Sequence, residues 1–178
     1  MRLSDYTDYT LRVLMYCAAN PGRLVTIAEL ADSHQVSKNH LMKIVNDLGR
    51  QGVLETTRGR GGGLRLLKPP STIRLGDVLR QAETDFRLVE CFDAATDTCT
   101  LTPSCRLKGV LASALQAYFA ALDSVTLADI AGPTAGLKQT LASRPRQAGA
   151  PVLVQVPMQV PMHGPAPRRQ RAKAPPLG

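Results

Sequence analysis

The feature that most constrains the fold of this chain is a pair of capped helical segments separated by only a few residues. Thr26 precedes the first segment, residues 27–33, and Ser37 precedes the second, residues 38–50. A Ser or Thr side chain in this position accepts a backbone N–H bond and so fixes where a helix begins. Two short helices joined so closely must turn sharply, which predicts a helix-turn-helix.

A glycine-rich hairpin is expected directly after the second helix. Residues 53–57 and 64–67 alternate between apolar and polar side chains, as strands do, and the turn at 58–63 contains four glycines and two arginines. A helix-turn-helix followed by a hairpin is the order of a winged helix-turn-helix. We therefore predict a mainly α fold built around this domain.

Helical periodicity extends on both sides of the motif. Apolar spacing predicts a helix over residues 4–19 before it and another over residues 73–83 after it. A longer apolar stripe predicts a helix from about Pro103 to Ser124. Its members are Leu107, Val110, Leu111, Ala114, Leu115, Tyr118, Phe119 and Leu122. This stripe is long for so small a domain, so we expect half of it to pack against a second subunit.

The chain divides into three predicted parts. Residues 1–85 form the winged helix-turn-helix DNA-binding domain, and residues 86–131 hold a cysteine cluster loop and the long dimerisation helix. Residues 132–178 contain nine of the 13 prolines and seven basic residues without any acidic one. A segment of this composition cannot build a packed core, so we predict a disordered, Pro-rich basic tail.

Charge is distributed unevenly within the first two parts. Residues 1–75 hold 11 basic and 6 acidic residues, whereas residues 76–132 hold 4 basic and 8 acidic ones. A basic half beside an acidic half is typical of a protein that binds phosphates at one end, which here suggests double-stranded DNA. Aromatic residues make up only 4% of the chain, which argues against single-strand binding by base stacking.

The sequence gives no indication of a membrane or secreted protein. No apolar run approaches the roughly 18–20 residues that span a bilayer. Asp5 and Asp8 interrupt the N-terminal segment, so it lacks a secretory pattern. We expect a cytoplasmic protein, in a reducing compartment where clustered cysteines are more often ligands or sensors than structural disulfides.

The second helix of the motif is expected to enter the major groove with its first residues near base edges. Asn39 and His40 can bind base edges, and Ser37 and Lys43 suit phosphates. Arginines at the hairpin tip can enter a neighbouring minor groove or bind the backbone. The predicted DNA contacts are Ser37, Lys38, Asn39, His40, Lys43, Arg58, Gly59 and Arg60. The alternative interpretation is an ordinary solvated helix face and a mobile turn.

Three of the four cysteines lie within one short segment, at Cys91, Cys99 and Cys105. Thiolates are soft ligands that suit iron–sulfur clusters and zinc. Three ligands are one short of the usual four, which suggests a site left chemically open. The cysteines could instead be unliganded thiols or a disulfide switch. Cys17 lies among apolar neighbours and is expected to fill the core.

An enzyme is not expected. Catalysis at a metal or cluster would need general acid–base or nucleophilic groups beside it. Residues 86–110 contain no histidine and no convincing pair of this kind.

Three stretches resemble a known family: TDYTLRVLMYCA at residues 7–18, the segment VSKNHLMKIVNDLGRQGVLETTRGRGGGLRLLKPPSTIRLGDVLR at 36–80, and CTLTPSCRLKGVL at 99–111. They resemble the NsrR/IscR family of winged-helix iron–sulfur repressors, over about residues 1–131. The resemblance implies a homodimer with an iron–sulfur cluster in each subunit and a palindromic operator.

Within the family, the resemblance is to the nitric-oxide-sensing branch. IscR-like members place a histidine ligand three residues after the last cysteine, where this chain has Lys108. NsrR-like members use a carboxylate near the N-terminus of the partner subunit, and Asp8 is the matching residue. The resemblance implies a cluster, 4Fe–4S rather than 2Fe–2S, held by the three cysteines and by Asp8 across the dimer.

The same resemblance implies that nitric oxide is the signal and that nitrosylation of the cluster releases operator DNA. The regulated genes would then serve nitric oxide detoxification. Two alternatives stay open at this point: a regulator of the same family that senses iron or cluster status, and a thiol redox switch. The acidic residues of the loop, Glu90, Asp93 and Asp97, could also replace Asp8 as the fourth ligand.

Overall fold

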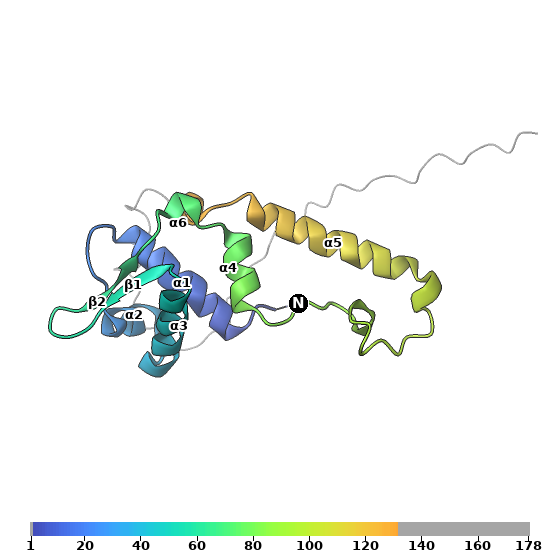
Figure 1. Ribbon diagram of the computed structural model, residues 1–178, viewed down its shortest axis with the longest axis horizontal. Coiled ribbons are helices and arrows are strands. Elements are labelled where there is room, and N and C mark those ends of the chain that lie inside the picture. Colours follow the sequence, from blue (N-terminus) through green and yellow to red (C-terminus); the bar gives the residue numbers. More distant parts are fainter. Residues whose placement is uncertain (1, 132–178) are drawn as a thin grey trace, which may run out of the picture. The chain divides into compact units, whose positions relative to one another are not determined.

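The computed structural model describes residues 2–131, and the tail predicted at 132–178 lies outside the described residues. This part contains six α-helices and one two-stranded sheet, and all of them except the last helix follow the predicted order (Figure 1). The elements are α1 (Asp5–Ala19), α2 (Ile27–His34), α3 (Lys38–Arg50), β1 (Leu54–Thr57), β2 (Gly63–Leu66), α4 (Leu75–Ala82), α5 (Arg106–Asp123) and α6 (Leu127–Ala131). Short 3-10 turns are η1 (Pro70–Thr72), η2 (Glu90–Phe92) and η3 (Thr102–Ser104). The predicted winged helix-turn-helix is confirmed.

The predicted caps begin the helices of the motif. The Thr26 hydroxyl accepts the backbone N–H of Glu29 at 3.1 Å, and the Ser37 hydroxyl accepts that of His40 at 3.3 Å. Between the two helices Gln35 adopts a left-handed backbone conformation with φ of 56°. This conformation ends α2 and redirects the chain, so that α3 starts three residues later.

The hairpin is fixed to the segment that leads into α2. Strands β1 and β2 pair antiparallel from Leu54 opposite Leu66 to Thr57 opposite Gly63. Val25 adds a bridge to Leu64, with N···O distances of 2.9 and 2.8 Å. A Cβ atom at Gly63 would lie 2.6 Å from the carbonyl oxygen of Val25, so this approach requires glycine.

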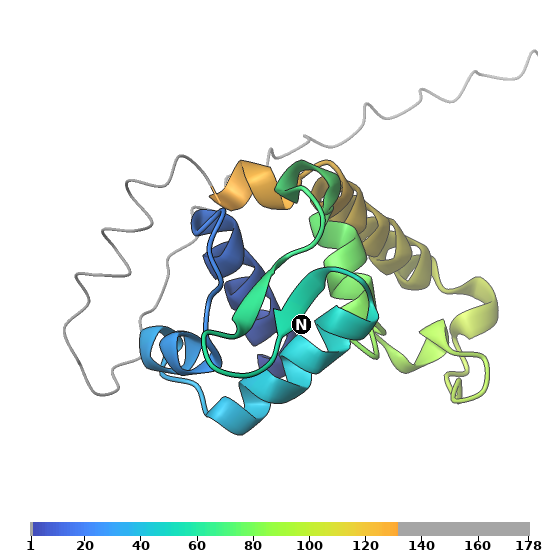
Figure 2. The same ribbon diagram turned by 60° about the vertical axis from the view of Figure 1, so that its left-hand side comes forward.

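Helix α1 lies at the centre of the core, where it packs against α3, α4, α6 and the hairpin (Figure 2). The largest fully buried side chains are aliphatic ones such as Leu14, Leu30, Leu41, Ile44, Leu64 and Leu127. Burying an aliphatic side chain of this size contributes about 1.5–3 kcal/mol. Cys17 belongs to this core with 4% of its surface exposed, which confirms its predicted place.

Two predicted helix starts differ from those in the structure. The helix expected from residue 73 begins at Leu75, after the turn η1. The helix expected near Pro103 begins at Arg106, because Pro103 lies in the turn η3 and Cys105 is extended, with φ of −76° and ψ of 107°. Helix α6 was not predicted, although the Asp129 carboxylate accepts the Thr126 N–H at 2.7 Å and so caps its start.

Helix α5 has no buried residue among the described part of the chain. Its apolar stripe is left uncovered, with 61% of Leu107 and 64% of Val110 exposed. Only α4 packs extensively against it among residues 2–131. Within the same residues, no helix is both long and apolar enough to cross a membrane.

Candidate DNA-binding surface and cysteine loop

The residues predicted to contact DNA are exposed at the start of α3 and at the hairpin tip. Ser37, Lys38, Asn39, His40 and Lys43 all lie on the solvent side of α3, opposite its buried aliphatic side chains. Ser37 also caps the helix, which sequence analysis anticipated separately from its suggested phosphate contact. The first turn of α3 is therefore held in shape while its side chains face outward.

Uncompensated positive charge gathers at these two places. Lys38, Lys43, Arg58 and Arg60 form no ion pair within residues 2–131, whereas Arg50 pairs with Asp47 on α3 and Arg65 on β2 pairs with Glu55 on β1. At the hairpin tip Gly59 has φ of 96°, a conformation that glycine adopts freely. Unpaired basic side chains on a protruding helix start and a glycine-rich tip suit phosphate binding.

A tyrosine from α1 anchors α3. The Tyr6 hydroxyl donates to Asp47 Oδ2 at 2.6 Å, and the ammonium of Lys43 lies 5.7 Å from the centre of the Tyr6 ring. Burial, with the Asp47 carboxylate beside it, raises the pKa of Tyr6 to about 12. The phenol therefore stays protonated and keeps donating at neutral pH. Sequence reasoning missed this contact, because Tyr6 and Asp47 are 41 residues apart.

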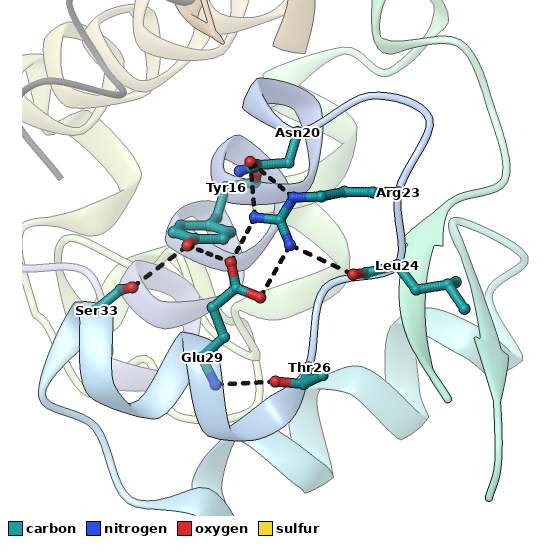
Figure 3. A network of polar contacts seen from close by, with 7 residues as sticks. All are labelled: Tyr16, Asn20, Arg23, Leu24, Thr26, Glu29 and Ser33. Atoms are coloured by element: carbon teal, nitrogen blue, oxygen red, sulfur yellow. Dashed lines mark hydrogen bonds and ion pairs between the residues drawn. The ribbon is translucent and has the colours of Figure 1, made fainter. Parts of the chain in front are cut away.

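A second polar network ties α2 to α1 (Figure 3). The Glu29 carboxylate accepts the Tyr16 hydroxyl at 2.7 Å and a guanidinium nitrogen of Arg23 at 3.0 Å, while Arg23 also donates to Asn20. The hydrogen bonds from Arg23 lower the pKa of Glu29 to about 2. Only one half of a capping box forms at Thr26: the backbone N–H of Glu29 bonds to the Thr26 hydroxyl, whereas the Glu29 carboxylate binds Arg23 and Tyr16 instead of the Thr26 N–H.

The lowered pKa of Glu29 defines when this network contributes to stability. A carboxyl with a depressed folded-state pKa stabilises the fold above its ordinary value of 4.5 and loses that contribution as the pH falls toward about 2. Arg23 is 45% exposed, so solvent screening keeps the contribution small. The network therefore serves mainly to orient the helix-turn-helix on α1.

The three loop cysteines are all free thiols, with Cys91 buried and Cys99 and Cys105 half-buried. Within residues 2–131, no group of three or more His, Cys, Asp or Glu side chains is close enough to hold a metal ion. The structure thus places the three cysteines in one loop without bringing their sulfur atoms together. Their donor chemistry fits an iron–sulfur cluster, and gathering them would require the loop to rearrange.

The loop has little regular structure to oppose such a rearrangement. Between Cys91 and Cys105 it contains only single 3-10 turns and local bonds, such as the Cys99 N–H to Asp97 Oδ1 at 3.0 Å. Cys105 is the N-cap of α5, and its N–H donates to the Thr102 carbonyl at 3.4 Å. Any ligand held by Cys105 would therefore be attached directly to the start of α5.

Asp8, the predicted ligand from a partner subunit, lies on α1. Its carboxylate pairs with Arg12 at 2.5 Å, and both side chains are almost half exposed. Exposed pairs of this spacing contribute only about 0.3–0.5 kcal/mol to stability, so little free energy opposes binding of the carboxylate to another partner. The loop acids are engaged locally: Asp93 pairs with Arg87, and Asp97 accepts from the Thr102 hydroxyl.

Native thiol labelling is expected to separate Cys17 from the loop cysteines. Burial raises the pKa of the Cys17 thiol to about 12, so it is neither ionised nor accessible at neutral pH. We expect iodoacetamide to modify Cys99 and Cys105 in the cluster-free folded protein, Cys91 more slowly and Cys17 only after unfolding. Peptide mass spectrometry over time measures these rates. Native labelling of Cys17 as fast as Cys99 would contradict its burial.

Comparisons with known sequences place this chain among transcriptional regulators. Residues 3–133 match the Rrf2 family model, described as an iron-dependent transcriptional regulator. Over 131 residues, the chain is 52% identical to the HTH-type transcriptional regulator NsrR of Bacillus subtilis (strain 168), an alignment that covers 73% of this chain and 90% of that protein. It is 53% identical to NsrR of Bacillus licheniformis over 73% of this chain and 92% of that protein.

Solved structures show the same fold at lower identity. Staphylococcus aureus CymR in its oxidized form matches with a TM-score of 0.60 and 23% identity, over 75% of this chain and 98% of that one. T. potens IscR matches with a TM-score of 0.58 and 23% identity, over 83% of this chain and 93% of that one. The resemblance to the NsrR/IscR family found in the sequence is confirmed by the family match and the curated relatives.

Proposed function

The chain belongs to the Rrf2 family of transcriptional regulators, and from this premise we propose that it is an iron–sulfur cluster-dependent repressor that releases operator DNA in response to nitric oxide. The observation that carries the proposal is the set of free cysteines Cys91, Cys99 and Cys105, which lie in one irregular loop that ends at the first residue of α5. Relatives at 52 and 53% identity bear the name NsrR, which supports the same assignment.

DNA binding in this proposal is the work of α3 and the hairpin. Asn39 and His40 contact base edges in the major groove, and the unpaired side chains of Lys38 and Lys43 neutralise phosphates beside them. Arg58 and Arg60 extend the contact at the hairpin tip, where Gly59 allows close approach to the DNA backbone. Tyr6 and the Glu29 network hold this surface in one orientation.

Two subunits are proposed to associate through the uncovered stripe of α5. This arrangement buries Leu107 and Val110 and presents two copies of α3 to a two-fold symmetric operator. A partner subunit also offers Asp8 as an oxygen ligand, which Arg12 holds only through an exposed pair. A repressor acts where the chromosome lies, so the proposal includes the cytoplasmic location expected from the sequence.

The loop cysteines are proposed to hold the cluster, 4Fe–4S rather than 2Fe–2S, together with Asp8. When bound, the cluster supplies iron atoms that react with nitric oxide. Lys108 contributes no ligand while it is protonated, which leaves the fourth position to a carboxylate oxygen rather than to imidazole. Cys105 caps α5, so a change in the ligands at the loop alters the start of the proposed dimer helix.

Anaerobic purification tests this function. The protein is expected to show visible charge-transfer absorbance and to contain iron and acid-labile sulfide, and nitric oxide is expected to bleach that absorbance. Protein that contains neither iron nor sulfide, and whose DNA binding follows the thiol–disulfide ratio, would refute the cluster and favour the thiol switch. A cluster that survives excess nitric oxide but is lost under iron limitation would favour an iron-status sensor.

Substitutions on the DNA-binding surface are expected to have two distinct effects. Lys43→Ala and Arg60→Ala remove phosphate contacts, so they are expected to weaken binding to selected and to random DNA alike. Each is also expected to reduce the slope of log affinity against log salt concentration by about 1. Asn39→Ala removes a base contact and is expected to reduce discrimination between sequences by about 1–3 kcal/mol. Fluorescence anisotropy at several salt concentrations measures both effects.

The control for these substitutions is Arg2→Ala. It deletes the same charge from an exposed pair with Asp5, outside α3 and the hairpin, and is expected to leave both the salt slope and the discrimination between sequences unchanged. Parent-like affinity and selectivity in all three surface variants would mean that the DNA-binding surface is wrongly assigned.

A further inference from the structure

Arg80 of α4 and Asp123 at the end of α5 make a two-pronged contact. Arg80 Nη1 and Nη2 donate to Asp123 Oδ1 and Oδ2, each at 2.7 Å. The guanidinium also lies 4.4 Å from the centre of the Phe119 ring on α5. Paired parallel bonds and ring stacking fix orientation as well as distance. Both charged groups are about 40% exposed, so the contact adds little stability and mainly sets geometry.

The backbones of α4 and of the end of α5 approach closely at the same place. A Cβ atom at Gly76 would lie 1.8 Å from Asp123 Oδ1, so any side chain at this position would displace the carboxylate. Leu75 N–H donates to the Val125 carbonyl at 3.0 Å, and Arg74 Nη1 donates to the Asp123 carbonyl at 2.6 Å. We call Arg80, Asp123, Phe119 and Gly76 the α4–α5 clasp.

The clasp lies where the cysteine loop and the DNA-binding elements meet. On one side, the rings of Phe119 and Phe86 meet edge-on with their centres 4.7 Å apart, and Phe86 begins the segment that leads to Cys91. On the other side, α4 buries Val78 against the core and packs on α1, which in turn packs on α3. Figure 1 shows α5 extending from this region toward the cysteine loop, with the hairpin at the opposite end of the described residues.

We propose that Arg80 and Asp123 are positioning residues that fix the angle between α5 and the DNA-binding domain. The inference rests on the proposed function, in which two α5 helices form the dimer. The separation of the two α3 helices then depends on the angle at which each domain leaves α5. Half-sites one helical turn apart, about 34–36 Å, accept only a narrow range of that separation. The clasp thus sets which half-site spacing the dimer accepts.

The test compares DNA spacing rather than affinity alone. Asp123→Asn and Arg80→Gln keep side-chain size and weaken the clasp. Asp77→Asn is the matched control, because Asp77 pairs with the same Arg80 at 3.5 Å but both residues of that pair lie on α4. The probe is a two-fold symmetric duplex selected by the parent protein from a random library, used as selected and with one base pair inserted or deleted at its centre.

We expect the parent and Asp77→Asn to bind the selected spacing more tightly than the altered spacings. In the clasp variants this affinity ratio is expected to fall about five- to tenfold, a change of the size found for couplings between contacting residues. Binding to a single half-site is expected to stay parent-like. Backbone hydrogen exchange at Leu75 and Leu127, which bond across the junction, is expected to accelerate in the clasp variants.

The outcomes separate the clasp from the proposed function. Unchanged hydrogen exchange at Leu75 and Leu127 in both variants would show that the clasp does not hold α4 and α5 together. Faster exchange with an unchanged preference for the selected spacing would show that the clasp does not position the DNA-binding domains. A parent protein that selects no symmetric duplex would refute the proposed function, and the exchange rates would then decide alone whether the pair holds the two helices together.

Discussion

Replacing Cys99 with alanine is expected to abolish the proposed iron–sulfur cluster, and the same result is expected for Cys91 and Cys105. Three thiolates from one loop leave no spare sulfur ligand, since Cys17 is buried in the core. Losing one leaves two thiolates, too few to retain a cluster that normally has four ligands. The measurement is visible absorbance with iron and sulfide content after anaerobic purification, and each value is expected to fall to background.

Cys17→Ala is the matched control for these variants. It removes a thiol from α1 without touching the loop, so the cluster is expected to persist at parent content. The core loses one small buried side chain, and the expected cost is a modest fall in the free energy of unfolding, of about 1–2 kcal/mol. Full cluster content in any of the three loop variants would show that the remaining residues suffice and that the ligand assignment is wrong.

Val110→Asp is expected to convert the proposed dimer into monomers. Val110 is 64% exposed in one subunit and lies on the apolar stripe proposed to meet its counterpart. A two-fold axis places the substitution on both sides of the interface, and each unpaired buried charge costs about 3–5 kcal/mol. The dimer dissociation constant is therefore expected to rise more than about a hundredfold. Analytical ultracentrifugation across a concentration series measures it.

Ser113→Asp provides the comparison on the same helix. Ser113 is exposed and lies outside the apolar stripe, so a carboxylate there is expected to remain solvated and to leave the dimer intact. Circular dichroism checks that both variants keep their helices. A Val110→Asp protein that stays dimeric would place the interface on another surface and would remove the proposed path from the loop to the operator.

Local sequence signals predicted the elements of the DNA-binding domain well. Thr26 and Ser37 cap the helices they were expected to cap, because capping depends on a bond to a residue only three positions away. Helix α6 carried a similar signal at Thr126 and Asp129, which could have been found in the same way. The start of α5 was placed too early, since Pro103 suits a 3-10 turn as well as a first helical turn.

Contacts between distant segments could not be predicted from the sequence pattern. Tyr6 meets Asp47, and Arg80 meets Asp123, across 41 and 43 residues, and apolar periodicity does not identify polar partners at such separations. The cysteine loop shows the same limit. Residue types identify Cys91, Cys99 and Cys105 as candidate ligands, but the irregular backbone between them determines whether their sulfur atoms converge, and within one subunit they do not.

Operator affinity in three states tests the central claim most directly. A two-fold symmetric duplex selected by the cluster-containing protein is titrated with cluster-containing, cluster-free and nitric-oxide-treated protein at one salt concentration. The cluster can favour DNA binding only if it binds more tightly to the conformation that binds DNA. We predict tight binding in the first state and binding at least about tenfold weaker in the other two, a coupling of about 1.4 kcal/mol or more. Equal affinity in all three states would contradict control of DNA binding by the cluster.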